Sequence, residues 1–176
     1  MTKKELSELI KIEIYEPYKK AKGRIRFFDK IWLRYFSPES NAILLVRKKE
    51  YFEQKRRGRI FSRLFHAKLV KRYGIHISEG TIIKKGLKIA HPTNIVITKC
   101  EIGENFTIYQ SCTIGQKSST GVVKPMIGDN VTMYAGSMII GNVVVSNGVV
   151  IGANSVLLSD AKTPGVYVGS PAKLVK

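Results

Sequence analysis

Histidine is the residue type of this 176-residue chain best suited to acid–base chemistry, and the chain has three. An imidazole titrates near neutral pH, so it can take a proton from an attacking hydroxyl and later return it to a leaving group. His66 falls in a basic helical segment and His76 at the entrance to a repetitive region, whereas His91 is the one histidine inside the repeats. His91 is therefore the candidate general base, and its alternative role is to fill a corner beside Pro92.

The remaining metal-ligating and nucleophilic residues predict neither a metal site nor a disulfide framework. A catalytic zinc site needs about three convergent protein ligands, which one histidine in the repeats does not supply. Cys100 and Cys112 are the only cysteines, and this number fits a reducing compartment. We interpret both as small buried hydrophobes, because the neighbouring cation Lys99 would point to the opposite face of a strand from Cys100. No metal cofactor is expected.

The residues from Ile77 onward repeat with a period of six. An aliphatic side chain opens each unit, in three phased runs separated by one extra residue and by the longer stretch 115–126. The thirteen hexad positions are Ile77, Ile83, Ile89, Ile95, Ile102, Ile108, Ile114, Ile127, Met133, Ile139, Val145, Ile151 and Leu157. We interpret the stretch 115–126 as a protruding loop, because its Ser, Gly and Pro residues break the repeat.

A period of six matches neither a helix nor a flat strand, whose apolar spacings are 3.6 and 2. Several units also place Gly directly after the aliphatic residue and Asn two positions later, as in Ile102-Gly103-Glu104-Asn105. Three short strands per turn, each pointing one aliphatic inward, with Gly and Asn at tight left-handed corners, satisfy this pattern. The repeats therefore predict a stack of triangular coils around an aliphatic column.

The residues before the repeats have helical spacing. Thr2 followed by Glu5 forms a capping-box start, and the apolar stripe after it predicts a helix of about four turns that Pro17 interrupts. Two further helices are expected over 41–57 and 60–73.

Helix-boundary residues support these two helices. Ser37 followed by Pro38 is typical of an N-terminal cap, and Gly58 and Gly74 are typical helix stops. The chain thus divides into a helical region, 1–74, and a repeat domain, 75–176.

Composition is that of a globular protein, with 44% hydrophobic and 24% charged residues. The net charge of +17 is uneven, because residues 1–76 hold 21 Lys and Arg against 8 Asp and Glu. No apolar run has the length of a signal peptide core or a membrane span. A cytoplasmic location is therefore expected, with peripheral contact at the inner face of the cell membrane as the alternative.

The repeats, together with Gly74-Ile75-His76-Ile77 and the stretch from Leu87 to Ile97, resemble the hexapeptide-repeat acyltransferases, and within them the serine acetyltransferase-like branch. The stretch from Asn41 to Gly58 extends the resemblance to polysaccharide-biosynthesis O-acetyltransferases of that branch. The resemblance implies a left-handed parallel β-helix, acetyl-CoA as cosubstrate, and a homotrimer with active sites between adjacent subunits. A dimer of trimers is the alternative assembly.

The resemblance also implies site residues. It places the catalytic histidine at His91. Small residues at Ala135, Gly136 and Ala153 would let the pantetheine arm of CoA approach the backbone, although corner geometry explains them equally well. Lys173 would meet a CoA phosphate as a point charge.

Two positions depart from the serine acetyltransferase pattern. Ala90 stands where those enzymes carry an Asp before the histidine, and Lys124 replaces the histidine of a His-Pro pair that helps form the serine site. Lys124 is therefore the candidate substrate-binding residue. A backbone carbonyl or Glu101 would have to orient His91.

The basic helical region is expected to attract a negative partner. Arg47–Lys49 and Lys55–Arg59 are interleaved with aromatic residues. An anionic glycan or lipid-linked sugar and an anionic membrane both fit this charge, whereas nucleic acid is disfavoured because no recognised nucleic-acid module accompanies it. A plain solvated helix face is the alternative.

Three functions follow from these residues. The first is an O-acetyltransferase acting on a sugar hydroxyl in surface-polysaccharide (capsule or lipopolysaccharide) biosynthesis. The second is a serine O-acetyltransferase. The third is a non-catalytic trimeric scaffold that binds polyanions or membrane.

Overall fold

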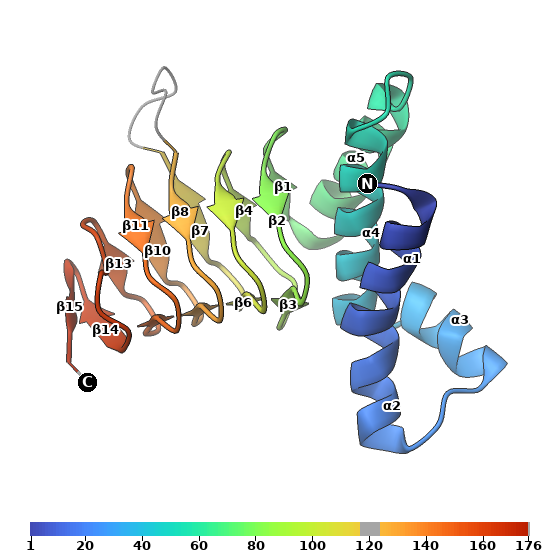
Figure 1. Cartoon of the computed structure of the whole chain (residues 1–176), viewed down its shortest axis with the longest axis horizontal. Helices are drawn as coiled ribbons and strands as arrows, with labels where there is room; N and C mark the ends of the chain where they lie inside the picture. Colours follow the sequence, from blue (N-terminus) through green and yellow to red (C-terminus); the bar gives the residue numbers. More distant parts are fainter. Residues whose placement is uncertain (117–123, 176) are drawn as a thin grey trace. The chain divides into compact units, whose positions relative to one another are not determined.

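The computed structural model describes residues 1–116 and 124–175, which form two compact units, Met1–Gly74 and Ile75–Lys176. The first unit is helical and the second consists of short stacked strands (Figure 1). Residues 117–123, within the expected loop 115–126, lie outside the described residues.

The first unit contains five α-helices and one π-helical turn among the described residues. They are α1 (Lys3–Ile10), η1 (Lys11–Tyr15), α2 (Glu16–Lys22), α3 (Phe27–Tyr35), α4 (Pro38–Glu53) and α5 (Arg59–Tyr73). The expectation that Pro17 interrupts the first helix is wrong, because the helical path continues to Lys22. The turn η1 widens the helix just before Pro17, which then occupies the first turn of α2, where its missing N–H costs little.

Helix ends follow the capping residues of the sequence. Thr2 and Glu5 form a reciprocal capping box with bonds of 2.9 and 3.1 Å, and the Ser37 hydroxyl accepts the Ser40 N–H at 3.4 Å. Gly74 ends α5 in the left-handed conformation, with φ 65°. Helix α4 ends at Glu53, four residues before the expected end, because residues 54–58 form a turn closed by a 2.8 Å bond from Gly58 N–H to the Lys55 carbonyl.

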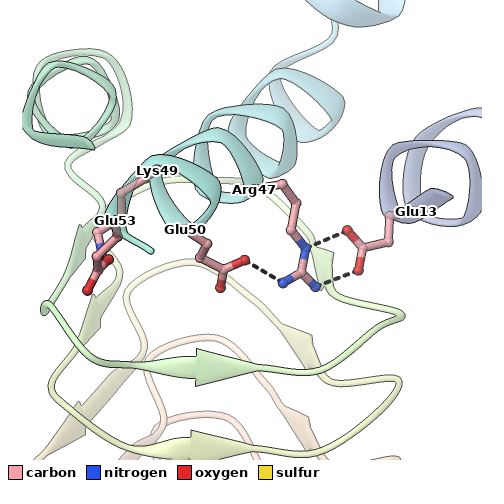
Figure 2. A network of polar contacts seen from close by, with 5 residues as sticks. All are labelled: Glu13, Arg47, Lys49, Glu50 and Glu53. Carbon is pink, nitrogen blue, oxygen red and sulfur yellow. Dashed lines mark hydrogen bonds and ion pairs between the residues drawn. The ribbon is translucent and has the colours of Figure 1, made fainter. Parts of the chain in front are cut away.

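Arg47 and Lys49 do not face solvent, which corrects the expectation that the whole Arg47–Lys49 run attracts a negative partner. The Arg47 guanidinium is buried between Glu13, at 2.6 Å, and Glu50, at 2.7 Å, and the Lys49 ammonium lies 2.8 Å from Glu53 (Figure 2). Both cations are therefore paired with carboxylates of the helical unit itself.

The second unit is a left-handed parallel β-helix, which confirms the expected fold class. Its strands are β1 (His76–Ile77), β2 (Ile82–Ile83), β3 (Lys88–Ile89), β4 (Val96–Ile97), β5 (Glu101–Ile102), β6 (Thr107–Ile108), β7 (Thr113–Gly115), β8 (Met126–Ile127), β9 (Thr132–Met133), β10 (Met138–Ile140), β11 (Val144–Val145), β12 (Val150–Ile151), β13 (Val156–Leu157), β14 (Val166–Gly169) and β15 (Ala172–Leu174).

From β1 to β13, strands three apart in the chain pair in register, and with β14 and β15 they form three sheets. Sheet A has the order β1-β4-β7-β10-β13, sheet B the order β2-β5-β8-β11, and sheet C the order β3-β6-β9-β12-β14-β15. All pairs are parallel except β14 with β15, which closes sheet C as an antiparallel hairpin. Within the described residues, no helix is long and apolar enough to span a membrane.

All thirteen hexad positions are buried, as expected from the repeat. Twelve of them take the inward place on a strand, but in β4 that place belongs to Ile97, which pairs with Ile77 and Ile114. Ile95 is buried at the corner before β4. The corner that carries His91 is therefore two residues longer than the hexad repeat predicts.

The Gly and Asn of the repeat have different roles. Asn105 adopts the left-handed conformation, with φ 57°, but Gly103 is not in that region. A Cβ on Gly103 would lie 2.6 Å from the carbonyl of Gly128 in the next coil. The expectation that both residue types form left-handed corners thus holds for Asn105 and for corner glycines such as Gly136, with φ 70°, whereas Gly103 permits close stacking of coils.

Candidate active site

The corner between sheets C and A carries most of the candidate site residues. Successive coils are joined there by backbone hydrogen bonds from Ser111 to Thr93 at 2.9 Å, from Gly136 to Gln110 at 3.0 Å and from Asn154 to Ala135 at 2.9 Å. We call this stack of corners, residues 90–95, 109–112, 134–137 and 152–155, the C–A column. It brings His91, Ala135, Gly136 and Ala153 onto one edge of the β-helix.

His91 lies in the C–A column directly after β3, with an exposed side chain and φ 52°. Few non-glycine residues adopt this conformation, and histidine is among those enriched in it. Among the described residues, no carboxylate or carbonyl forms a hydrogen bond with the imidazole, so its lone pair is available to a hydroxyl. This exposure is what a general base needs, and the role itself remains a prediction.

Tyr109 and Tyr134 form an aromatic wall beside His91 that the sequence reasoning missed. The Tyr109 ring centroid lies 6.4 Å from that of His91 and 5.0 Å from that of Tyr134. The pattern could have shown it, since each tyrosine directly follows a hexad residue at the end of a sheet C strand. Gln110, next to Tyr109, has a buried side-chain oxygen without a hydrogen-bond partner in the structure.

The small residues that were expected to contact the cofactor also lie in the C–A column, in coils that follow the coil of His91 along the chain. Ala153 is exposed and Ala135 is partly exposed. Gly136 has φ 70°, and a Cβ there would overlap the Asn154 side chain. Corner geometry therefore accounts for Gly136, and neither alanine has a left-handed φ.

Lys124 and Lys173 do not lie in the C–A column. Lys124 precedes β8 at the corner between sheets A and B, where its ammonium lies 2.6 Å from Glu101. This hydrogen-bonded ion pair lowers the pKa of the Glu101 carboxyl. Glu101 is thus engaged by Lys124, and within one chain it does not orient His91. Lys173 is exposed on β15, opposite Val168.

Neither cysteine is an activated nucleophile. Both are buried and free, as expected for small hydrophobes. Burial raises the pKa of Cys100 to about 12 and also raises the pKa of Cys112, so both are protonated thiols at neutral pH. Among the described residues, no group of three or more His, Cys, Asp or Glu side chains is placed to hold a metal ion.

Comparison with known proteins points to one group of enzymes. The chain is 45% identical over 105 residues to a serine acetyltransferase of Staphylococcus epidermidis and 43% identical to that of Staphylococcus aureus. Each match covers 58% of this chain and 49% of the relative, so the chain spans about half the length of the curated relatives it matches. No model of a known protein family matches the chain.

Solved structures share the fold over nearly the whole chain. A serine acetyltransferase of Neisseria gonorrhoeae superimposes with a TM-score of 0.80 at 23% identity, covering 98% of this chain and 66% of the other. The Brucella abortus enzyme in complex with coenzyme A gives 0.75 at 23% identity, with coverages of 98% and 68%. At these identities the structural likeness establishes the fold alone.

Proposed function

We propose that the chain is an O-acetyltransferase that transfers an acetyl group from acetyl-CoA to the hydroxyl group of L-serine. The 45% identity to a serine acetyltransferase carries this proposal. A contiguous match over 58% of a 176-residue chain must include the repeats around His91, wherever it begins. Serine is preferred to the sugar acceptor expected from sequence because the relatives named above are serine acetyltransferases.

His91 supplies the chemistry in this proposal. Its imidazole accepts the proton of the serine hydroxyl as the oxygen attacks the thioester carbonyl of acetyl-CoA. A backbone N–H stabilises the oxyanion that forms. The C–S bond then breaks, and the imidazolium returns its proton to the CoA sulfur. A direct transfer fits the residues better than an acyl-enzyme, since both thiols are buried and protonated.

The C–A column offers a path for the cosubstrate. Acetyl-CoA would run along the column past Ala135, Gly136 and Ala153, and Lys173 would meet one of its phosphates. Lys124 belongs to another corner, so we assign its acceptor contact to a neighbouring subunit of a homotrimer. A dimer of trimers remains the alternative assembly.

A sugar hydroxyl is the second candidate acceptor, and two residues favour it. Ala90 provides no carboxylate next to His91, and Lys124 offers an ammonium paired with Glu101 where the serine acetyltransferase pattern has a histidine. A surface-polysaccharide precursor would suit such a site and the basic helical unit, and peripheral contact with an anionic membrane would accompany it.

The deciding experiment measures CoA thiol release from acetyl-CoA with L-serine and a panel of sugar nucleotides and glycans. The sharpest variant is His91→Asn, because asparagine tolerates the left-handed backbone at this position and removes only the base. His76→Asn is the matched control, since it makes the same change at an exposed residue outside the C–A column.

We expect serine-dependent release that His91→Asn lowers by roughly 10²- to 10⁴-fold and His76→Asn leaves nearly unchanged. Release with sugars alone would select the second candidate. If His91→Asn kept wild-type turnover, the assignment of the base would be wrong. Absence of both release and acetyl-CoA binding would support the non-catalytic scaffold instead.

A further inference from the structure

The helical unit contains a basic cavity that the proposed acetyl transfer does not use. Its volume is about 510 Å³, within the range of small-molecule sites. Helices α3, α4 and α5 line it. Five of its residues are cations, and its lining includes no carboxylate: Arg34, Lys48, Lys68, Lys71 and Arg72.

The cations of the cavity differ from Arg47 and Lys49, the neighbours of Lys48 on α4, in having no carboxylate partner among the described residues. Arg47 and Lys49 each lie within 2.8 Å of a carboxylate (Figure 2). Lys48, between them in sequence, faces the cavity, and among the described residues neither it nor the other four cations forms an ion pair. The same helix thus neutralises its charge on one side and leaves it uncompensated on the other.

The uncompensated charges are crowded. Burial lowers the pKa of Lys48, and the positive charges of Arg34 and Lys68 lower it further. The ammonium groups of Lys48 and Lys68 lie 5.4 and 5.9 Å from the ring centroid of the same residue, Phe65. An anion in the cavity would relieve the mutual repulsion of these groups and accept hydrogen bonds from them.

The cavity also has an apolar side. Leu44, Leu45 and Phe65 line it. Arg34, Lys48 and Phe65 also line a neighbouring hollow of about 870 Å³, whose further lining combines the apolar Leu6, Ile10 and Phe52 with the charged Lys3, Lys11, Lys30 and Glu16. A ligand with a strong anionic head and an apolar tail would therefore find a partner for each part in this cavity.

We propose that this cavity binds an organic phosphate or diphosphate whose ester group is apolar. The phosphate lies among Arg34, Lys48 and Lys68, and the apolar group packs against Phe65. All of these residues belong to the helical unit, so the inference does not depend on the acetyl transfer proposed for the β-helix.

Such a ligand could come from a membrane or from solution. Helix α3, which contributes Arg34 and Tyr35, exposes aromatic side chains: Phe27 is 72% exposed, Phe28 79% and Trp32 52%. Aromatic residues beside cations are typical of helices that lie at a lipid surface. The test must therefore distinguish a lipid phosphate from a free organic phosphate.

The test is calorimetric titration of the full chain with n-octyl phosphate below its micelle-forming concentration. Two control compounds are titrated in the same way. Inorganic phosphate has the anionic head without the apolar tail, and neutral n-octyl glucoside has the apolar tail without the anionic head. We compare Lys48→Gln/Lys68→Gln with Lys19→Gln/Lys20→Gln, which removes the same charge from exposed positions on α2. Circular dichroism verifies that each variant is folded.

We expect octyl phosphate to bind more tightly than either fragment, and the cavity variant to weaken it by about tenfold or more while the α2 variant does not. Equal weakening by both variants, or no preference over inorganic phosphate, would overturn the proposal. Sedimentation with phosphatidylcholine vesicles containing phosphatidic acid shows whether the ligand is a membrane lipid or a soluble organic phosphate. Vesicle binding lost only in the cavity variant indicates a lipid, and octyl phosphate binding without vesicle binding indicates a soluble ligand.

Discussion

One buried guanidinium faces two buried carboxylates in the helical unit. Arg47 donates two hydrogen bonds to Glu13, at 2.6 and 2.8 Å, and one to Glu50, whose other oxygen has no partner in the structure. Burial raises the pKa of Glu50, the charge of Glu13 raises it further, and Arg47 only partly offsets this. Glu13 is thus the better partner of Arg47, and Glu50 carries the excess negative charge.

The raised pKa of Glu50 gives stability a defined pH dependence. A carboxyl that binds protons more tightly in the folded state stabilises the fold below its unfolded pKa, and this contribution is lost as pH rises through the folded pKa. We expect Glu50→Gln to gain stability relative to wild type as pH rises from about 4 toward 7. Chemical denaturation across this range measures the difference.

At neutral pH, Glu13→Gln should have the opposite effect on stability to Glu50→Gln. Because it breaks the bidentate pair with a buried Arg47, it should cost about 3 kcal/mol in unfolding free energy. A stability difference between Glu50→Gln and wild type that stays flat or declines with pH would contradict the assignment of the excess charge to Glu50.

Among the elements, the coils of the β-helix depend on close backbone stacking. We expect Gly103→Ala to lower the unfolding free energy by about 1–3 kcal/mol, because the new Cβ would meet the Gly128 backbone at 2.6 Å and the Asp129 carboxylate. Thermal unfolding followed by circular dichroism at matched protein concentration measures the loss.

Gly115→Ala is the matched control for this change. Neither glycine has a left-handed φ, and a Cβ on Gly115 would meet the flexible end of Ile140 at 3.0 Å, which can shift. Equal melting temperatures for the two variants would show that the coils have room to separate.

The hexad repeat made the β-helix predictable, because an inward aliphatic at every sixth residue leaves few other folds. It could not show that Ile97 rather than Ile95 takes the strand position, since both are aliphatic and buried. Helix α3 was not anticipated either. Its apolar residues do recur at helical spacing, as Phe27, Ile31 and Tyr35 show, but its N-terminus is closed by Arg26 and Asp29 rather than by a serine or threonine, so no usual capping residue marks it.

The candidate site was predictable only in part. The sequence distinguished His91 by residue type and the small residues by resemblance, and the C–A column brings these together. The Lys124–Glu101 pair was not predictable, because its partners are 23 positions apart and meet only through the pairing of β5 with β8. The aromatic wall depends on the pairing of β6 with β9, which brings together two tyrosines that are 25 positions apart and lie outside the hexad positions.

The whole molecule is expected to assemble through its β-helix. The outward positions of sheet B carry Ile82, Met126 and Val144, each about half exposed, around Glu101. Apolar side chains gathered on one face indicate a contact surface. We expect the wild-type chain to have the mass of three subunits by light scattering.

Met126→Glu/Val144→Glu should reduce this mass, because it buries two unpaired charges in the proposed contact. Thr107→Glu/Thr132→Glu, on the outward face of sheet C, is the control and should keep the wild-type mass. A wild-type monomer, or trimers that survive the sheet B change, would refute this interface and with it the acceptor contact assigned to Lys124.

Because the coils stack at a regular spacing, the number of coils between two residues of the C–A column sets the distance between them along the stack. Neighbouring strands lie about 4.8 Å apart, so the coil of Ala153 lies roughly 14 Å along the stack from that of His91. A cosubstrate anchored near Ala153 would reach His91 only if its arm had that length. If the chain transfers an acetyl group as proposed, the number of coils between the two residues, rather than any single side chain, would determine the length of the acyl carrier that it accepts.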